Sequence, residues 1–128
     1  MVQKQLKLYI MLKDHTRRYH ELVRLMEKLG GEIPETMGAF DNLHKSSTKD
    51  GALSKKTKEL IALGIAITVR CDGCISFHVN DALKSGASTA EVVETIGVAV
   101  LMGGGPSVVY GCEALEAMHQ FAILQNGQ

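Results

Sequence analysis

Two cysteines and a histidine lie close together in the sequence, and their types and spacing suit redox chemistry. Cys71 and Cys74 are separated by Asp72 and Gly73, so their sulfurs can bond if the turn between them folds suitably. If a helix begins near Cys74, His78 lies one turn further along the same face, where its imidazole can take the thiol proton. This segment is therefore a candidate thiol redox centre that cycles between dithiol and disulfide.

The charges around Cys74 act in opposite directions on its thiol. The N-terminal dipole of a helix and the nearby Arg70 both favour a thiolate, which would lower the pKa of the thiol. Asp72 opposes that shift. The sequence leaves the balance between these influences open.

Glu59 is a carboxylate on an otherwise apolar helical face, at the spacing shared by Ala62, Leu63, Ala66 and Ile67. It lies twelve residues before Cys71, about 18 Å along a straight helix, so direct contact with that cysteine is excluded. If the next helix folds back, His78 returns by roughly 10 Å toward Glu59 and leaves a gap that side chains and one water could bridge. We expect a proton relay in the order Glu59, water, His78 and Cys74.

The elements that must position these residues are helices. Apolar spacing, capping residues and glycine or proline breaks predict an all-α fold of six helices with no strand, over residues 3–29, 36–45, 54–70, 74–85, 88–102 and 107–124. Gly30-Gly31 and Gly86 are the expected stops of two helices, Ser54 is an expected N-cap, and Ser88 with Glu91 has the spacing of a capping box. In the helix that carries His78, Ser76 and Asn80 are expected to lie away from the buried stripe.

Length and charge limit the kind of protein. The 128 residues suit one domain, and the 14 basic and 14 acidic side chains give a net charge of zero, which favours neither nucleic acid nor an anionic membrane as partner. No segment has the length of a transmembrane helix or the pattern of a signal peptide, so we expect a cytoplasmic protein. Residues 60–67 and 95–102 are apolar on nearly every side, and a domain of this size cannot enclose both. These helices predict a homo-oligomer.

The spacing of Glu59, Cys71, Cys74 and His78 resembles the E-x11-C-x-x-C-x3-H signature of the alkyl hydroperoxidase D group within the carboxymuconolactone decarboxylase-like family. The break at residues 103–106, Gly-Gly-Gly-Pro, is similar as well. The resemblance covers roughly residues 34–118 and leaves the N-terminal helix, within residues 1–31, outside it. It implies a single-domain helical bundle over residues 1–128 that assembles into homotrimers or homohexamers.

The resemblance also implies an antioxidant activity, the reduction of peroxides through the two cysteines without any cofactor. Cys74 would attack the peroxide and become a sulfenic acid, Cys71 would resolve it into a disulfide, and His78 with Glu59 would relay protons. A peroxide or a disulfide would be the substrate. The founding member of the group works with a peroxiredoxin and a lipoyl-bearing donor, so an external dithiol is the expected source of electrons.

Two other functions compete with this interpretation. The wider family takes its name from lactone decarboxylation, a reaction that needs no dithiol. A zinc-stabilised module without turnover could use Cys71, Cys74 and His78 with His119 or Cys112 as a fourth ligand. We expect Cys112 to be a small buried side chain and His15, His20, His44 and His119 to lie at a surface or interface.

Overall fold

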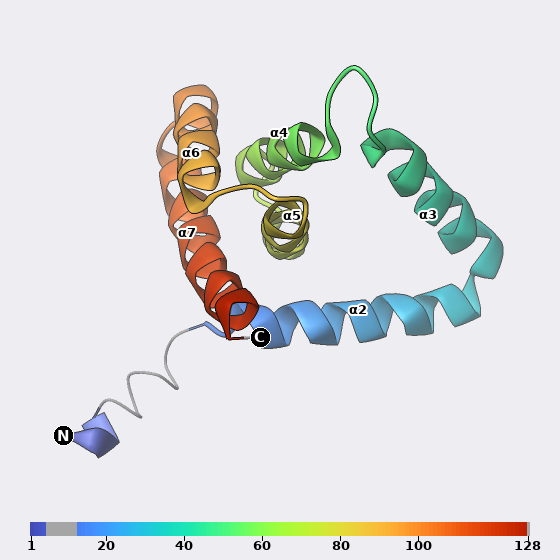
Figure 1. Cartoon of the computed structure of the whole chain (residues 1–128). Helices are drawn as coiled ribbons and strands as arrows, with labels where there is room; N and C mark the ends of the chain where they lie inside the picture. The colour runs from blue at the N-terminus through green and yellow to red at the C-terminus, as the bar shows by residue number, and fades with distance from the viewer. Residues whose placement is uncertain (5–12, 128) are drawn as a thin grey trace.

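The protein is described by a computed structural model that covers residues 1–4 and 13–127 and is entirely helical there, which confirms the predicted all-α fold class (Figure 1). Beyond a short helical stretch at residues 2–4, its helices are α2 (His15–Glu32), α3 (Pro34–Thr48), α4 (Lys55–Thr68), α5 (Asp72–Lys84), α6 (Thr89–Gly103) and α7 (Gly105–Asn126). No helix in the described ranges is long and apolar enough to cross a membrane.

The N-terminal helix differs from its prediction at both ends. Residues 5–12 of the predicted 3–29 helix lie outside the described residues. The helix α2 begins only at His15, because the Asp14 side chain accepts a hydrogen bond from the Arg17 backbone N–H and caps it. Gly30-Gly31 does not end it, and α2 continues to Glu32. The end comes where a proline follows, which disfavours a helical conformation at Ile33 (φ −132°).

The remaining helices start close to their predicted signals. Ser54 caps α4, and Ser88 forms the predicted capping box with Glu91 at the start of α6. Gly86, at a φ of +94°, follows α5 as expected. Several boundaries differ by two or three residues: α3 spans Pro34–Thr48, α4 ends at Thr68, α5 begins at Asp72 instead of near residue 74, and α7 spans Gly105–Asn126.

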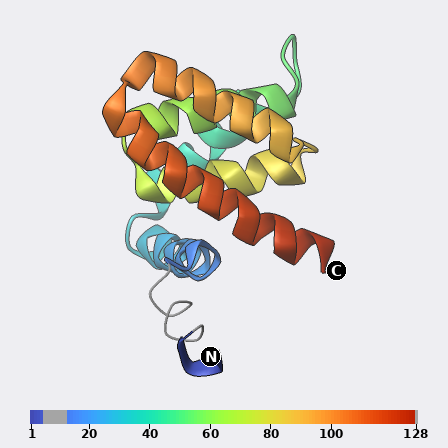
Figure 2. The same cartoon turned by 90° about the vertical axis from the view of Figure 1, so that its left-hand side faces the viewer.

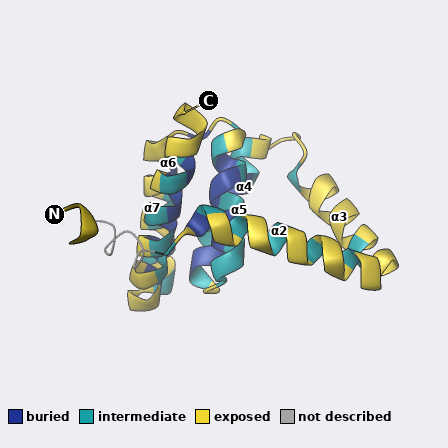
Figure 3. Ribbon diagram, turned by 90° about the horizontal axis from the view of Figure 1, so that it is seen from below, coloured by how far each residue is buried: buried dark blue, intermediate teal, exposed yellow. Residues whose placement is uncertain are grey.

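Helices α4 to α7 form the packed body that positions the candidate site (Figure 2). Leu63 and Ile67 of α4 meet Ile75 and Val79 of α5 in a core where all four are fully buried. The helix α2 crosses the end of this body, where the ring of Tyr19 packs edge-on against Phe77 and Phe121. Figure 3 shows the buried residues concentrated in the body and the long exposed surfaces of α2 and α3.

The helix α5 is more enclosed than its sequence pattern indicates. It contacts α2, α4, α6 and α7, so Ser76 and Asn80 are both only 4% exposed instead of lying away from the core. Their burial shows that a polar residue type does not mark the solvent side of a helix that is covered on several faces.

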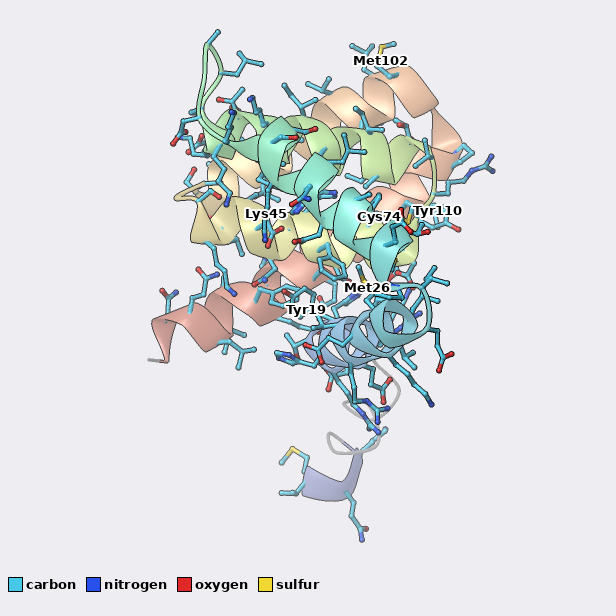
Figure 4. The ribbon with its side chains drawn as sticks, turned by 90° about the vertical axis from the view of Figure 1, so that its right-hand side faces the viewer. Tyr19, Met26, Lys45, Cys74, Met102 and Tyr110 are labelled. Atoms are coloured by element: carbon cyan, nitrogen blue, oxygen red, sulfur yellow. A yellow bond between two sulfur atoms is a disulfide. The ribbon has the colours of Figure 1, made fainter. Side chains whose placement is uncertain are left out.

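The helices α4 and α6 leave several large apolar side chains exposed in the described part of the chain. The apolar face, as we call it, consists of Ile61 and Ile65 of α4 with Val98, Leu101 and Met102 of α6. Leu101 is 80% and Met102 is 76% exposed, and Figure 4 shows Met102 projecting from the upper edge of the molecule. Ile61, Ile65, Val98 and Met102 also line a mostly apolar hollow of about 520 Å³ between α4 and α6.

Candidate functional site

The two cysteines are joined at the start of α5. Cys71 is the N-cap residue, and its sulfur accepts a hydrogen bond of 3.4 Å from the backbone N–H of Cys74. The two sulfurs form a disulfide, with 5.2 Å between the Cα atoms. Arg70, at a φ of +60°, reverses the chain between α4 and this turn. The structure therefore brings the predicted cysteine pair together at a helix N-terminus, where the dipole favours a thiolate once the disulfide is reduced.

The helix α2 lies against the residues between the cysteines. A Cβ atom at Gly73 would lie 2.7 Å from Cδ2 of Leu22, so a larger residue at this position requires the end of the leucine side chain to shift. Next to it, the carboxylate of Asp72 binds the Lys13 ammonium at 2.8 Å and the Arg18 guanidinium at 2.7 Å. The helix thus meets the turn between Cys71 and Cys74 through both shape and charge.

These cations change the electrostatic role of Asp72. Its burial acts to raise the carboxyl pKa, but the hydrogen bond from Lys13 and the charges of Lys13 and Arg18 outweigh burial and hold the pKa below its ordinary value. The negative charge that would oppose a thiolate at Cys74 is thus compensated by two positive charges. Sequence reasoning missed both partners because Lys13 lies 59 positions away and no local motif links it to Asp72.

Glu59 and His78 are in direct contact. The Nδ1 atom of His78 lies 2.8 Å from Oε2 of Glu59, whose side chain is completely buried, while that of His78 is 22% exposed. The expected gap with a bridging water was wrong, because α5 packs closely along α4 and the two side chains span the remaining distance. When Nδ1 donates to an ionised Glu59, Nε2 is the ring atom that can accept a proton, and His78 stands one helical turn from Cys74.

Two residues that the sequence did not nominate, His44 and Asp81, lie near the Glu59 carboxylate. Oε1 has no hydrogen-bond partner among the described residues. One donor atom each of Glu59, His44 and Asp81 lie within 4.8 Å of one another. Burial and the charge of Glu59 raise the pKa of Asp81 above its ordinary value. His44 comes from α3 and Asp81 from α5, so only the folded chain reveals the cluster.

Two expectations about other side chains were wrong. Cys112 is exposed, because α7 turns Gly111 and Ala114 toward the core and leaves position 112 on the outside. His15 is only 1% exposed, and burial lowers its pKa.

The potential metal-ligand clusters in the described part of the chain contain no cysteine. They are His44, Glu59 and Asp81, and separately His15, Asp72 and Glu113. In the second cluster the ammonium of Lys13 already lies 2.8 Å from Asp72 and 3.1 Å from Glu113. Neither cluster has the donor set expected for a zinc site built on Cys71 and Cys74.

Residues 34–117 match the model of the carboxymuconolactone decarboxylase family, and the chain belongs to that family. Among solved structures, a carboxymuconolactone decarboxylase family protein from Legionella pneumophila is 45% identical, with a TM-score of 0.81 over 84% of this chain and 96% of that one. A family protein from Thermotoga maritima, described as having a possible involvement in the antioxidative response, is 25% identical, with a TM-score of 0.78 over 86% and 94%. An uncharacterized protein of Cupriavidus necator is 37% identical over 82% of this chain and 93% of its own length.

Proposed function

We propose that this protein is a thiol-dependent peroxidase or disulfide oxidoreductase of the alkyl hydroperoxidase D-like type. The observation that carries the proposal is the Cys71–Cys74 disulfide at the start of α5, followed one turn later by His78 in contact with buried Glu59. The possible antioxidative involvement described for the Thermotoga maritima relative supports the same chemistry. A reducing compartment such as the cytoplasm suits a cycle of this kind, because thiols are kept reduced there.

The cycle starts from the dithiol. His78 takes the proton of the Cys74 thiol, and the thiolate attacks the terminal oxygen of a hydroperoxide. The O–O bond breaks, Cys74 is oxidised to a sulfenic acid, and the alkoxide leaves as an alcohol with the proton returned by His78. The Cys71 thiol then attacks the Cys74 sulfur, so that the disulfide forms and water leaves. An external dithiol, of lipoyl type by analogy with the founding member, reduces the disulfide by thiol exchange and is itself oxidised.

The proposal includes a homotrimer or homohexamer. The apolar face supports it, because large apolar side chains that remain exposed on a single subunit mark interaction surfaces. We assign the apolar face to a second copy of this chain, because identical subunits are present in any solution of the protein. A peroxiredoxin is the expected protein partner by the same family analogy.

The first test is a mass and thiol count before and after one equivalent of cumene hydroperoxide, followed by dihydrolipoamide. We expect two thiols to be lost as a Cys71–Cys74 disulfide and restored by the dithiol. Cys74→Ser should abolish turnover, whereas Cys71→Ser should stop at a sulfenic acid that dimedone traps. Cys112→Ser is the matched control, because this exposed cysteine lies outside the turn. Full peroxide turnover by Cys74→Ser would contradict the assignment.

A further inference from the structure

Glu59 is a buried carboxylate in which only one oxygen has a polar contact. Its side chain has no exposed surface, Oε2 contacts His78, and Oε1 lacks a hydrogen-bond partner in the described ranges. A buried carboxylate oxygen without a hydrogen-bond partner is unfavourable, because its loss of hydration is not compensated, so a nearby proton or cation would stabilise it. The groups that can supply a proton lie near the Glu59 carboxylate.

Asp81 and His44 are these groups. Their donor atoms and that of Glu59 lie within 4.8 Å of one another. At Asp81, burial and the negative charge of Glu59 both favour the protonated acid, while the positive charges of His78, His44 and Lys55 oppose it. Two carboxyl groups this close favour a state in which a proton is shared between them.

The cluster adjoins an open cavity of about 800 Å³ between α3, α4 and α5. His44 and Asp81 line this cavity, but Glu59 does not. Its wall also carries five lysines, Lys45, Lys49, Lys55, Lys56 and Lys84, and Figure 4 shows Lys45 at the α3 side of the region. This positive surface disfavours a metal cation and leaves room for water and small buffer molecules.

We propose that Asp81 and His44 form the solvent end of the proton relay, through which buried Glu59 exchanges protons with water in this cavity. The inference rests on the proposed function and extends it. An external dithiol attacks the disulfide as a thiolate whose proton has gone to solvent. The sulfur that leaves needs a proton, which His78 and Glu59 supply and must then regain. Asp81 and His44 do not touch the reacting sulfurs; they act through Glu59.

The kinetic test compares Asp81→Asn and His44→Gln with Ser85→Ala, a control in the wall of the same cavity. Dihydrolipoamide-dependent hydroperoxide turnover is measured over about pH 6–8, at low buffer and with added imidazole. We expect about tenfold lower kcat for Asp81→Asn at low buffer, a smaller loss for His44→Gln, an unchanged KM for hydroperoxide and recovery with imidazole. A loss that imidazole does not relieve would indicate a structural role and overturn the inference. Stoichiometric Zn²⁺ binding to the wild type that Asp81→Asn abolishes would also overturn it, in favour of a metal site.

A second measurement does not depend on turnover. Carboxyl ¹³C NMR should show Asp81 titrating above its ordinary value of 3.8. This pKa should fall in Glu59→Gln, which removes a negative charge, and stay unchanged in Glu91→Gln, a substitution of the carboxyl in the α6 capping box. Turnover without this coupling would overturn the inference and leave the proposed function intact. If the Asp81 pKa depends on Glu59 but the protein reduces no hydroperoxide, the proposed function is wrong, and the relay that rests on it is wrong as well.

Discussion

Asp72 lies between the two cysteines, yet its charge is balanced by Lys13 and Arg18. This carboxylate therefore fixes α2 against the turn between Cys71 and Cys74 and adds little net negative charge beside Cys74. Because its folded pKa is lowered, its contribution to stability is present above the ordinary value of 3.8 and is lost as the pH falls through the lowered pKa.

We expect Asp72→Asn to reduce the free energy of unfolding by about 1 kcal/mol at neutral pH, since the pair is partly exposed and screened by solvent. The difference from wild type should shrink as the pH falls below 3.8. Urea unfolding at several pH values measures it. Asp41→Asn, which breaks an exposed pair with Lys45, should cost only a few tenths of a kcal/mol. Equal losses in the two variants at every pH would show that α2 is not fixed by Asp72.

Sequence spacing located the candidate site residues that lie within one helix or along one helical face. Cys71, Cys74 and His78 are local in sequence, and Glu59 stands out on an apolar stripe. Asp81 and Lys13 gave no such signal, because their partners belong to other elements. The sequence overestimated the distance between Glu59 and His78. Spacing along an ideal helix does not include the close packing of α4 and α5.

At the scale of the elements, side-chain caps fixed helix starts more reliably than glycines fixed helix ends. Ser54 and Ser88 each make the hydrogen bond expected of a cap. Gly30-Gly31 instead stays within α2, because a glycine pair permits a turn without requiring one. The decisive break between α6 and α7 is Gly104, at φ +68° and ψ −149°, a conformation that residues with a Cβ rarely adopt.

Gly104→Ala should therefore reduce the free energy of unfolding by about 1–3 kcal/mol. Gly105→Ala is the neighbouring control: a Cβ there meets no atom within 4 Å and its φ is not positive, so we expect a change within about 0.5 kcal/mol. Urea unfolding of the two variants gives the comparison. If both changed stability equally, the backbone of Gly104 would not be the origin of the break.

At the scale of the whole molecule, the apolar face is left exposed by residues 1–4 and 13–127 of its own subunit. The sequence predicted this from two helices that are apolar nearly all round, and in the structure Ile61, Ile65, Val98 and Met102 line one hollow between them. The sequence could not tell which residues would be left uncovered, because that depends on how α4 and α6 pack against α5 and α7.

Leu101→Glu places a charge on the apolar face, one helical turn after Val98, and should convert the proposed oligomer into monomers at micromolar concentration. Light scattering coupled to size exclusion measures the mass. Ile123→Glu is the control, because Ile123 is also exposed, at 71%, but lies near the end of α7. Wild-type protein that is already monomeric, or a Leu101→Glu oligomer of unchanged mass, would refute the proposed assembly.

The contact between Gly73 and Leu22 links positions that are far apart in sequence. Since a Cβ at position 73 would lie 2.7 Å from the end of the leucine side chain, a larger residue between the cysteines requires the residue on α2 to adjust. Among relatives that keep this helix in place, a larger residue at the position of Gly73 should accompany a smaller one at that of Leu22. Substitutions at the two sites should compensate one another, which would couple the N-terminal helix to the turn between Cys71 and Cys74 in the family's sequences.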